Sequence, residues 1–123
     1  MDYFQGNGPS AEKYFTVEGA NLTADIVVTA PQDFEVSLSA GSGFTNSLSI
    51  SPANGSVIST TVYVRLVADL GVNTYTGDVT LTSTGATDKT VSLSGEVKPA
   101  DPQFYYTAFL NDFSYLASAG GPS

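Results

Sequence analysis

The sequence contains no cysteine, no histidine and no tryptophan. Without cysteine no disulfide framework can form, so the fold has to be stabilised by its hydrophobic core. Without histidine or cysteine the usual general base, the usual zinc ligands and a thiol nucleophile are all missing. We therefore expect no catalytic residue, no metal and no cofactor, and a protein that is not an enzyme.

Positive charge is also scarce, since 4 Lys and Arg residues stand against 12 Asp and Glu residues, and the formal net charge is -8. A chain without a basic patch cannot neutralise phosphates, so nucleic acid is not an expected partner. No apolar run approaches the length of a membrane span, and membrane insertion is not expected either. Hydrophobic residues make up 41% of the 123 positions, as in one globular domain with a modest core.

Alternation of apolar and polar residues with a period of two is present along most of the chain. In the stretch 60–67, for example, Val62, Val64 and Leu66 share one face. Such alternation is typical of half-buried antiparallel strands. Seven strands are predicted, separated by turns rich in Gly, Pro, Asn and Asp, at 13–18, 25–29, 34–38, 48–50, 60–67, 78–82 and 90–97. The predicted fold is all-β, an immunoglobulin-like antiparallel β-sandwich of about seven or eight strands.

The inward-facing positions of these strands and the apolar residues near them define the predicted core. It comprises Phe15, Val17, Leu22, Ile26, Val28, Phe34, Val36, Leu38, Phe44, Leu48, Ile50, Val62, Val64, Leu66, Tyr75, Val79, Leu81, Val91 and Leu93. Tyr75 follows a glycine-containing turn. It is either a corner tyrosine whose hydroxyl bonds back to the backbone, as in immunoglobulin-like sandwiches, or an ordinary strand aromatic.

The two ends of the chain share a short motif. Residues 3–10, which begin with Tyr and end with Gly-Pro-Ser, match residues 115–123 when one position is gapped, and the two Gly-Pro-Ser tripeptides lie 113 positions apart. Either the match is due to chance, or it indicates an array with a repeat of about 110 residues. The predicted organisation is a β-sandwich over 1–97, a linker over 98–102 and, over 103–123, an additional β-strand segment that corresponds to the start of the next repeat.

The segment 103–115 is strongly aromatic and apolar on both faces of a strand. We name it the candidate assembly strand, with the key residues Phe104, Tyr105, Tyr106, Phe109, Leu110, Phe113 and Tyr115. An exposed strand of this composition would aggregate, so it needs a partner surface. Three alternatives remain: it completes its own sandwich, it inserts into an adjacent copy as a donor strand and builds a filament, or it is the start of the next domain.

Tyr63 and Arg65 form the candidate ligand surface, because both face outward on one predicted strand. A tyrosine of this kind can stack on a sugar ring, so a polysaccharide is a candidate partner. The same two residues could instead cover a sheet surface or contact a neighbouring domain. The scattered carboxylates contain no calcium-binding loop motif.

Three segments carry a resemblance to a known family: GNGPSAEKYFTVEGANLTADIVVTAP, FEVSLSAGSGF and TTVYVRLVADLGVNTYTGDVTLTSTGATDKTVSLSGEV. They resemble the immunoglobulin-like repeats of secreted and cell-surface Bacteroidetes proteins. The resemblance implies an extracellular or cell-surface accessory module, of the kind that accompanies hydrolases or adhesins and is exported by type IX secretion. It implies no catalytic residues. In the family a strand usually precedes the motif that begins here at Tyr3, so the resemblance also implies that the sandwich lacks its own first strand. The function expected is that of a spacer or self-assembling structural module, with carbohydrate binding or adhesion as the alternative.

Overall fold

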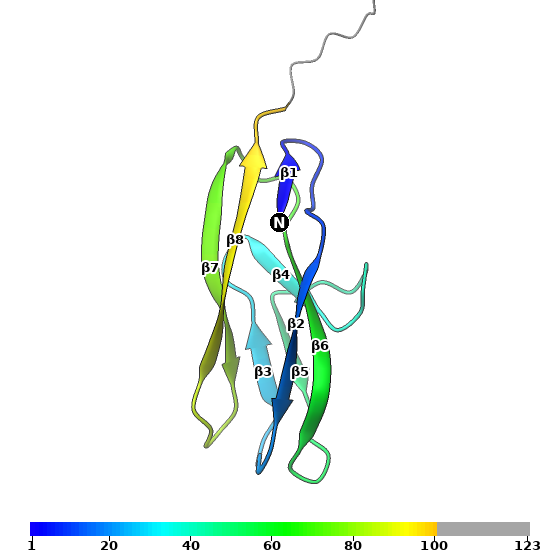
Figure 1. Ribbon diagram of the computed structural model, residues 1–123, viewed down its shortest axis with the longest axis vertical. Helices are drawn as coiled ribbons and strands as arrows, with labels where there is room; N and C mark the ends of the chain where they lie inside the picture. Colours follow the sequence, from blue (N-terminus) through cyan, green and yellow to red (C-terminus); the bar gives the residue numbers. More distant parts are fainter. Residues whose placement is uncertain (101–123) are drawn as a thin grey trace, which may run out of the picture.

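The computed structural model describes residues 1–100, and over this range the chain is all-β, with no helix. Eight strands follow one another along the sequence (Figure 1). They are β1 (Asp2–Phe4), β2 (Lys13–Gly19), β3 (Ile26–Thr29), β4 (Phe34–Ser37), β5 (Ser47–Ile50), β6 (Val57–Leu66), β7 (Asn73–Thr82) and β8 (Lys89–Lys98).

The strands form two sheets, which pack on each other as in a β-sandwich. The larger sheet has the order β1-β8-β7-β3-β5 and the smaller sheet has the order β2-β6-β4. All neighbouring strands are antiparallel except β1, which pairs in parallel with the end of β8. The long strands β6, β7 and β8 run along the long axis of the molecule (Figure 1).

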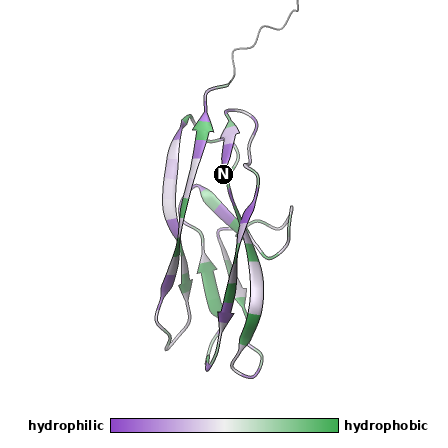
Figure 2. Ribbon diagram, viewed as in Figure 1, coloured by the Kyte–Doolittle hydropathy of each residue, from purple (hydrophilic) through white to green (hydrophobic). Residues whose placement is uncertain are grey.

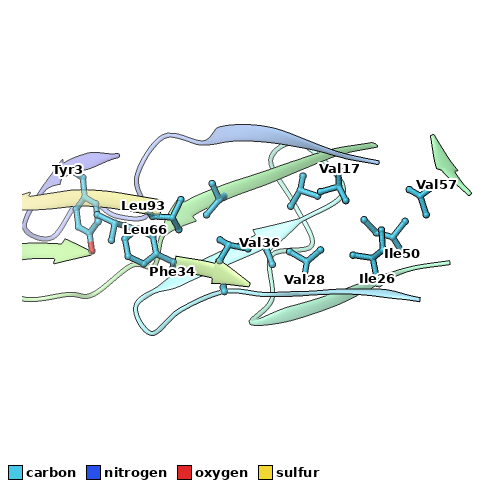
Figure 3. Packing of buried hydrophobic residues seen from close by; sticks show 14 of the residues in the cluster. Tyr3, Val17, Ile26, Val28, Phe34, Val36, Ile50, Val57, Leu66 and Leu93 are labelled. Carbon is cyan, nitrogen blue, oxygen red and sulfur yellow. The ribbon is translucent and has the colours of Figure 1, made fainter. Parts of the chain in front are cut away.

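The hydrophobic core lies between the two sheets and is made by alternate residues of each strand. On β6, Val62, Val64 and Leu66 are almost inaccessible, whereas the intervening Tyr63 and Arg65 are half-buried on the other face. Hydrophobic and hydrophilic stretches are interspersed along the long strands, whereas β3 is hydrophobic over most of its length (Figure 2). Side chains from both sheets meet along the length of the core (Figure 3).

All seven strands predicted from the sequence are present, and β6 and β7 begin earlier than predicted. The structure adds one strand to these seven, because Asp2–Phe4 forms β1 within the repeated motif itself. The expected absence of a strand before that motif stays a prediction. A strand of three residues is too short to show alternation, which explains why the pattern missed it. The core also contains Tyr3, Ala30, Val57 and Val97, which were not in the predicted core.

Two residues of the predicted core lie elsewhere. Leu38 is 46% exposed, because β4 ends at Ser37 and the chain turns away from the core there. Phe44 is half-buried and packs on the outer face of the smaller sheet, on Arg65, not between the sheets. Leu38 was predicted because the alternation was continued one residue past the end of β4, whereas Phe44 was included only as an apolar residue near the predicted strands.

The candidate assembly strand lies outside the described residues. The predicted boundaries of the linker and of the additional segment therefore stay predictions.

Candidate functional site

The outer face of the smaller sheet carries Tyr63, and its cross-strand neighbour there is a second tyrosine. Tyr14 on β2 is directly opposite Tyr63 in the register of the two strands. The ring centroids are 6.4 Å apart and the rings are tilted by 59°, which is within the range of favourable aromatic pairs. Tyr14 is 70% exposed, so one ring of the pair faces solvent.

Arg65, the other predicted ligand residue, lies two positions along the same face of β6 and has two partners of its own. Its Nε donates a hydrogen bond to Oε2 of Glu35 at 2.6 Å, and Glu35 is its register partner on β4. Its guanidinium carbon lies 3.9 Å from the centroid of the Phe44 ring. Arg65 is therefore engaged by an ion pair on one side and by an aromatic ring on one face.

The loop after β4 places Phe44 over Arg65. The hydroxyl of Ser37 accepts a hydrogen bond from the amide of Ser39, and its single proton is shared between the carbonyls of Ser39 and Ser42, which fixes the turn. The chain then returns beside β4, where Val36 and Thr45 exchange two backbone hydrogen bonds. This return brings the residue before Thr45, Phe44, onto the outer face of the sheet. The candidate ligand surface thus consists of a tyrosine pair, in which Tyr14 is exposed and Tyr63 is half-buried, beside an arginine whose contacts lie within the module.

The repeated motif at the start of the chain is a second candidate site, and we call residues 3–10 the N-terminal anchor. Tyr3 is buried, and its hydroxyl donates to the carbonyl of Val67 at 2.7 Å and accepts from the amide of Leu70 at 3.2 Å. A Cβ atom at Gly8 would lie 2.6 Å from the Tyr3 ring, so only glycine fits against that ring.

Ser10 closes the anchor at its other end. Its hydroxyl is buried, accepts a hydrogen bond from the amide of Leu66 at 2.9 Å and donates to the carbonyl of Ala11. The anchor therefore ties the start of the chain to the end of β6 and to the turn before β7. Tyr3, Gly8 and Ser10 have counterparts in Tyr115, Gly121 and Ser123, so the sequence repeats the residues that make these contacts.

The side of the sandwich between β2 and β8 is open, and we call this opening the β2–β8 groove. β1 covers β8 only from Glu96 to Lys98, and within residues 1–100 the outer edge of β8 from Lys89 to Gly95 has no strand beside it. A cavity of about 380 Å³ lies there, lined by Met1, Lys13, Phe15, Val91, Ser92 and Ser94 among others. A second cavity of about 540 Å³ lies further along the same side, between the end of β2 and the β7–β8 hairpin.

The described part of the chain contains no group of three or more acidic residues that could hold a metal ion. In the same range, no helix has the length and apolar character needed to cross a membrane.

Comparison with models of protein families, with curated proteins and with solved structures finds no match to this chain.

Proposed function

We propose that the chain is a non-catalytic structural module of an extracellular or cell-surface protein, which joins to further copies of itself through its C-terminal segment. The observation that supports this proposal is the motif repeated at the two ends. At the start of the chain this motif is an anchoring device, because Tyr3 and Ser10 are buried and bind backbone groups at the end of β6 and beyond it. A second copy of the same residues at 115–123 would fit the same receptor on another module.

The immunoglobulin-like character of the fold is part of the proposal. In the constant-type arrangement, strands B, E and D are neighbours in one sheet and C, F and G in the other. The sheets β2-β6-β4 and β8-β7-β3 have this order, with β5 as an additional strand beside β3 and β1 beside β8.

The corner tyrosine gives independent support. The hydroxyl of Tyr75 donates to the carbonyl of Gly71 at 2.7 Å, four residues upstream and near the start of β7, which takes the place of strand F. The corner predicted from the sequence is therefore present, and such corners are a hallmark of immunoglobulin-like sandwiches.

Size-exclusion chromatography with light scattering tests the assembly. The full chain is expected to form dimers or longer species whose mass rises with protein concentration. Truncation after residue 102 is expected to give a monomer with the circular dichroism of a β-protein. A full chain that stays monomeric at the highest soluble concentration would rule out the proposed assembly.

Carbohydrate binding is the second candidate function, and it is favoured by the exposed ring of Tyr14 beside Tyr63. An array of diverse polysaccharides tests it, with the Tyr14→Ala variant as the control. Binding to at least one glycan that is lost in the variant would support this function, and no binding across the array would exclude it.

A further inference from the structure

We propose that the receptor for the C-terminal segment is the β2–β8 groove of a second copy of this chain, in which residues 107–115 add a strand parallel to β8 and residues 115–123 replace the N-terminal anchor. This inference rests on the assembly proposed above. It identifies the acceptor surface, the direction of the added strand and its register.

The first reason is the unprotected edge of β8. Edge strands of natural proteins are commonly blocked by charges, proline or a covering segment. The stretch from Thr90 to Gly95 has no charged residue and no proline, and no strand covers it within residues 1–100. Behind this edge, Phe15 and Val91 line the groove and are only half-buried. The groove therefore has both free strand hydrogen bonds and incompletely buried apolar side chains.

The free hydrogen-bonding groups can be identified from the pairing of β1. The amide of Glu96 donates to the carbonyl of Met1 at 3.2 Å, so this amide points toward the edge of the sheet. Backbone groups alternate in direction along a strand, and β7 and β8 pair without a register shift. The amides of Ser94, Ser92 and Thr90 therefore point to the same edge, beyond the reach of the short β1.

The repeated motif sets the register of the added strand. Tyr3 lies opposite Val97 in the parallel pairing, and Tyr115 is the counterpart of Tyr3. Counting back along both strands places Phe113 opposite Gly95 and Phe109 opposite Val91. Because side chains alternate across a strand, both phenylalanines share the inward face with Tyr115.

The opposite face of the added strand would be directed to solvent in this register. Asp112, the one charged residue between 103 and 123, falls on that face, opposite Ser94. A one-residue slip would turn the carboxylate into the groove and both phenylalanines to solvent, so the residue pattern favours this register over its neighbours.

Chain length favours a second copy as the acceptor. In the proposed register Thr107 lies opposite Lys89, at the far end of β8 from Lys98, where the described chain leaves the sheet. The nine residues 99–107 would have to return along the whole of β8 within one molecule. At about 3.3 Å per residue these nine residues are only as long as β8 itself, so no residues remain to turn the chain at either end. A second copy has no such restriction.

Replacing the acceptor's own N-terminal anchor by residues 115–123 of another copy is also favourable, because the strand before residue 115 pairs with more of β8 than β1 does. The acceptor gives up β1, whose three residues pair with β8, and receives a strand that continues along the unpaired edge. The anchoring residues Tyr3, Gly8 and Ser10 are replaced by residues of the same type. Each molecule that joins the assembly then still has either an unoccupied β2–β8 groove or an unbound C-terminal segment. A head-to-tail assembly of this kind grows as a linear chain.

A complementation experiment tests the acceptor. Ser94→Pro removes an amide that points to the open edge and leaves the hydrogen bonds to β7 intact, since proline is tolerated at such edge positions. Ser94→Ala keeps the amide and is the matched control. Phe109→Asp combined with Phe113→Asp disables the donor segment without changing any residue of the acceptor groove.

The S94P chain alone and the double-Asp chain alone are each expected to be monomeric by light scattering, while S94A assembles like the unchanged protein. An equimolar mixture of the two variants is expected to form a dimer, with twice the mass of either chain. The S94P chain supplies an intact C-terminal segment, and the double-Asp chain supplies an intact groove. If the unchanged chain assembles and S94P assembles equally well, the groove is not the acceptor, although the assembly itself stands. If the unchanged chain is monomeric, both proposals fail.

Disulfide trapping tests register and partner, and the chain has no native cysteine to interfere. Cysteines at Ser94 and Asp112 of separate chains are expected to form a covalent dimer on oxidation, because directly opposite Cα atoms lie within disulfide range. Moving the second cysteine to Asn111, on the opposite face, is expected to reduce the yield at least about fivefold. When both cysteines are in one chain, a cross-linked monomer would overturn the assignment to a second copy.

Discussion

The hydroxyl oxygen of Tyr3, in the first strand, lies 2.7 Å from the carbonyl oxygen of Val67, 64 positions later in the chain. The same hydroxyl accepts a hydrogen bond from the amide of Leu70. One buried side chain therefore binds the start of the chain to the connection between β6 and β7, and this contact determines how firmly the N-terminal anchor is attached.

In the chain truncated after residue 102, where residues 115–123 cannot take the place of the anchor, Tyr3→Phe is expected to lower the free energy of unfolding by about 1–2 kcal/mol, because two hydrogen bonds are lost while the ring is kept. Urea unfolding followed by circular dichroism measures the change. Tyr14→Phe is the matched control, since Tyr14 is exposed and its hydroxyl makes no hydrogen bond within residues 1–100. Equal stabilities for the two variants would contradict the anchoring function of Tyr3.

In the same truncated chain, Gly8→Ala is expected to destabilise the protein by about 1–3 kcal/mol, as is typical of overpacking in a filled site. The added methyl group would lie 2.6 Å from the Tyr3 ring and 3.0 Å from the backbone of Ala68, so the ring or the anchor has to move. Gly71→Ala is the control, because a methyl group there meets no atom within 4 Å. The expected midpoint of thermal unfolding falls for the first variant and stays within about 2 °C for the second. A Gly8→Ala protein as stable as Gly71→Ala would show that the ring contact is unimportant.

The sequence was a good guide to the strands and a poorer guide to what lies between them. The period-two pattern predicted β2 to β8 because each presents alternate apolar residues to one core, and burial on one face fixes that pattern. It could not predict β1, which has three residues and is held by the hydroxyl of Tyr3 and the fit of Gly8. The repeated motif was the available signal, but it indicated a repeat and not the contacts.

The candidate ligand surface shows the same limit. Alternation correctly placed Tyr63 and Arg65 on the outer face of one strand, but it carried no information on cross-strand partners. Phe44 reaches Arg65 because hydrogen bonds of Ser37 turn the chain after β4. Loop conformation depends on such individual hydrogen bonds, which leave no period in the sequence.

Tyr75→Phe is expected to cost about 0.5–1.5 kcal/mol, the net value of one hydrogen bond, because the ring stays half-buried and only the bond to Gly71 is lost. Tyr63→Phe is the matched control, since Tyr63 also lies half-buried in a strand and its hydroxyl has no hydrogen-bond partner in the described part of the chain. Urea unfolding of both variants measures the difference in the free energy of unfolding, which is expected to depend on urea concentration with the same slope in both. If both variants lose the same stability, the corner hydrogen bond contributes nothing specific.

At high salt, the contact of Arg65 with the Phe44 ring is expected to contribute more to the stability of the protein than the ion pair of Arg65 with Glu35. Both charged side chains are about one-fifth exposed, so the ion pair is partly screened, and a coupling of about 0.2–1 kcal/mol is expected at low salt. The contact with the Phe44 ring, at 3.9 Å, is expected to contribute a similar amount. Added salt weakens the pair with the carboxylate and has little effect on the ring contact.

Double-mutant cycles with Glu35→Gln, Phe44→Leu and Arg65→Met separate the two contributions, measured by urea unfolding at low and at molar NaCl. The coupling of Arg65 to Glu35 is expected to fall by more than half at high salt, whereas the coupling to Phe44 changes little. Arg65→Lys is expected to retain part of the first coupling and lose most of the second, because an ammonium group cannot lie flat on a ring. A salt-independent coupling to Glu35 would mean that this pair is shielded from solvent. Arg65 would then be fixed more firmly within the module, and less available to a ligand, than its exposure indicates.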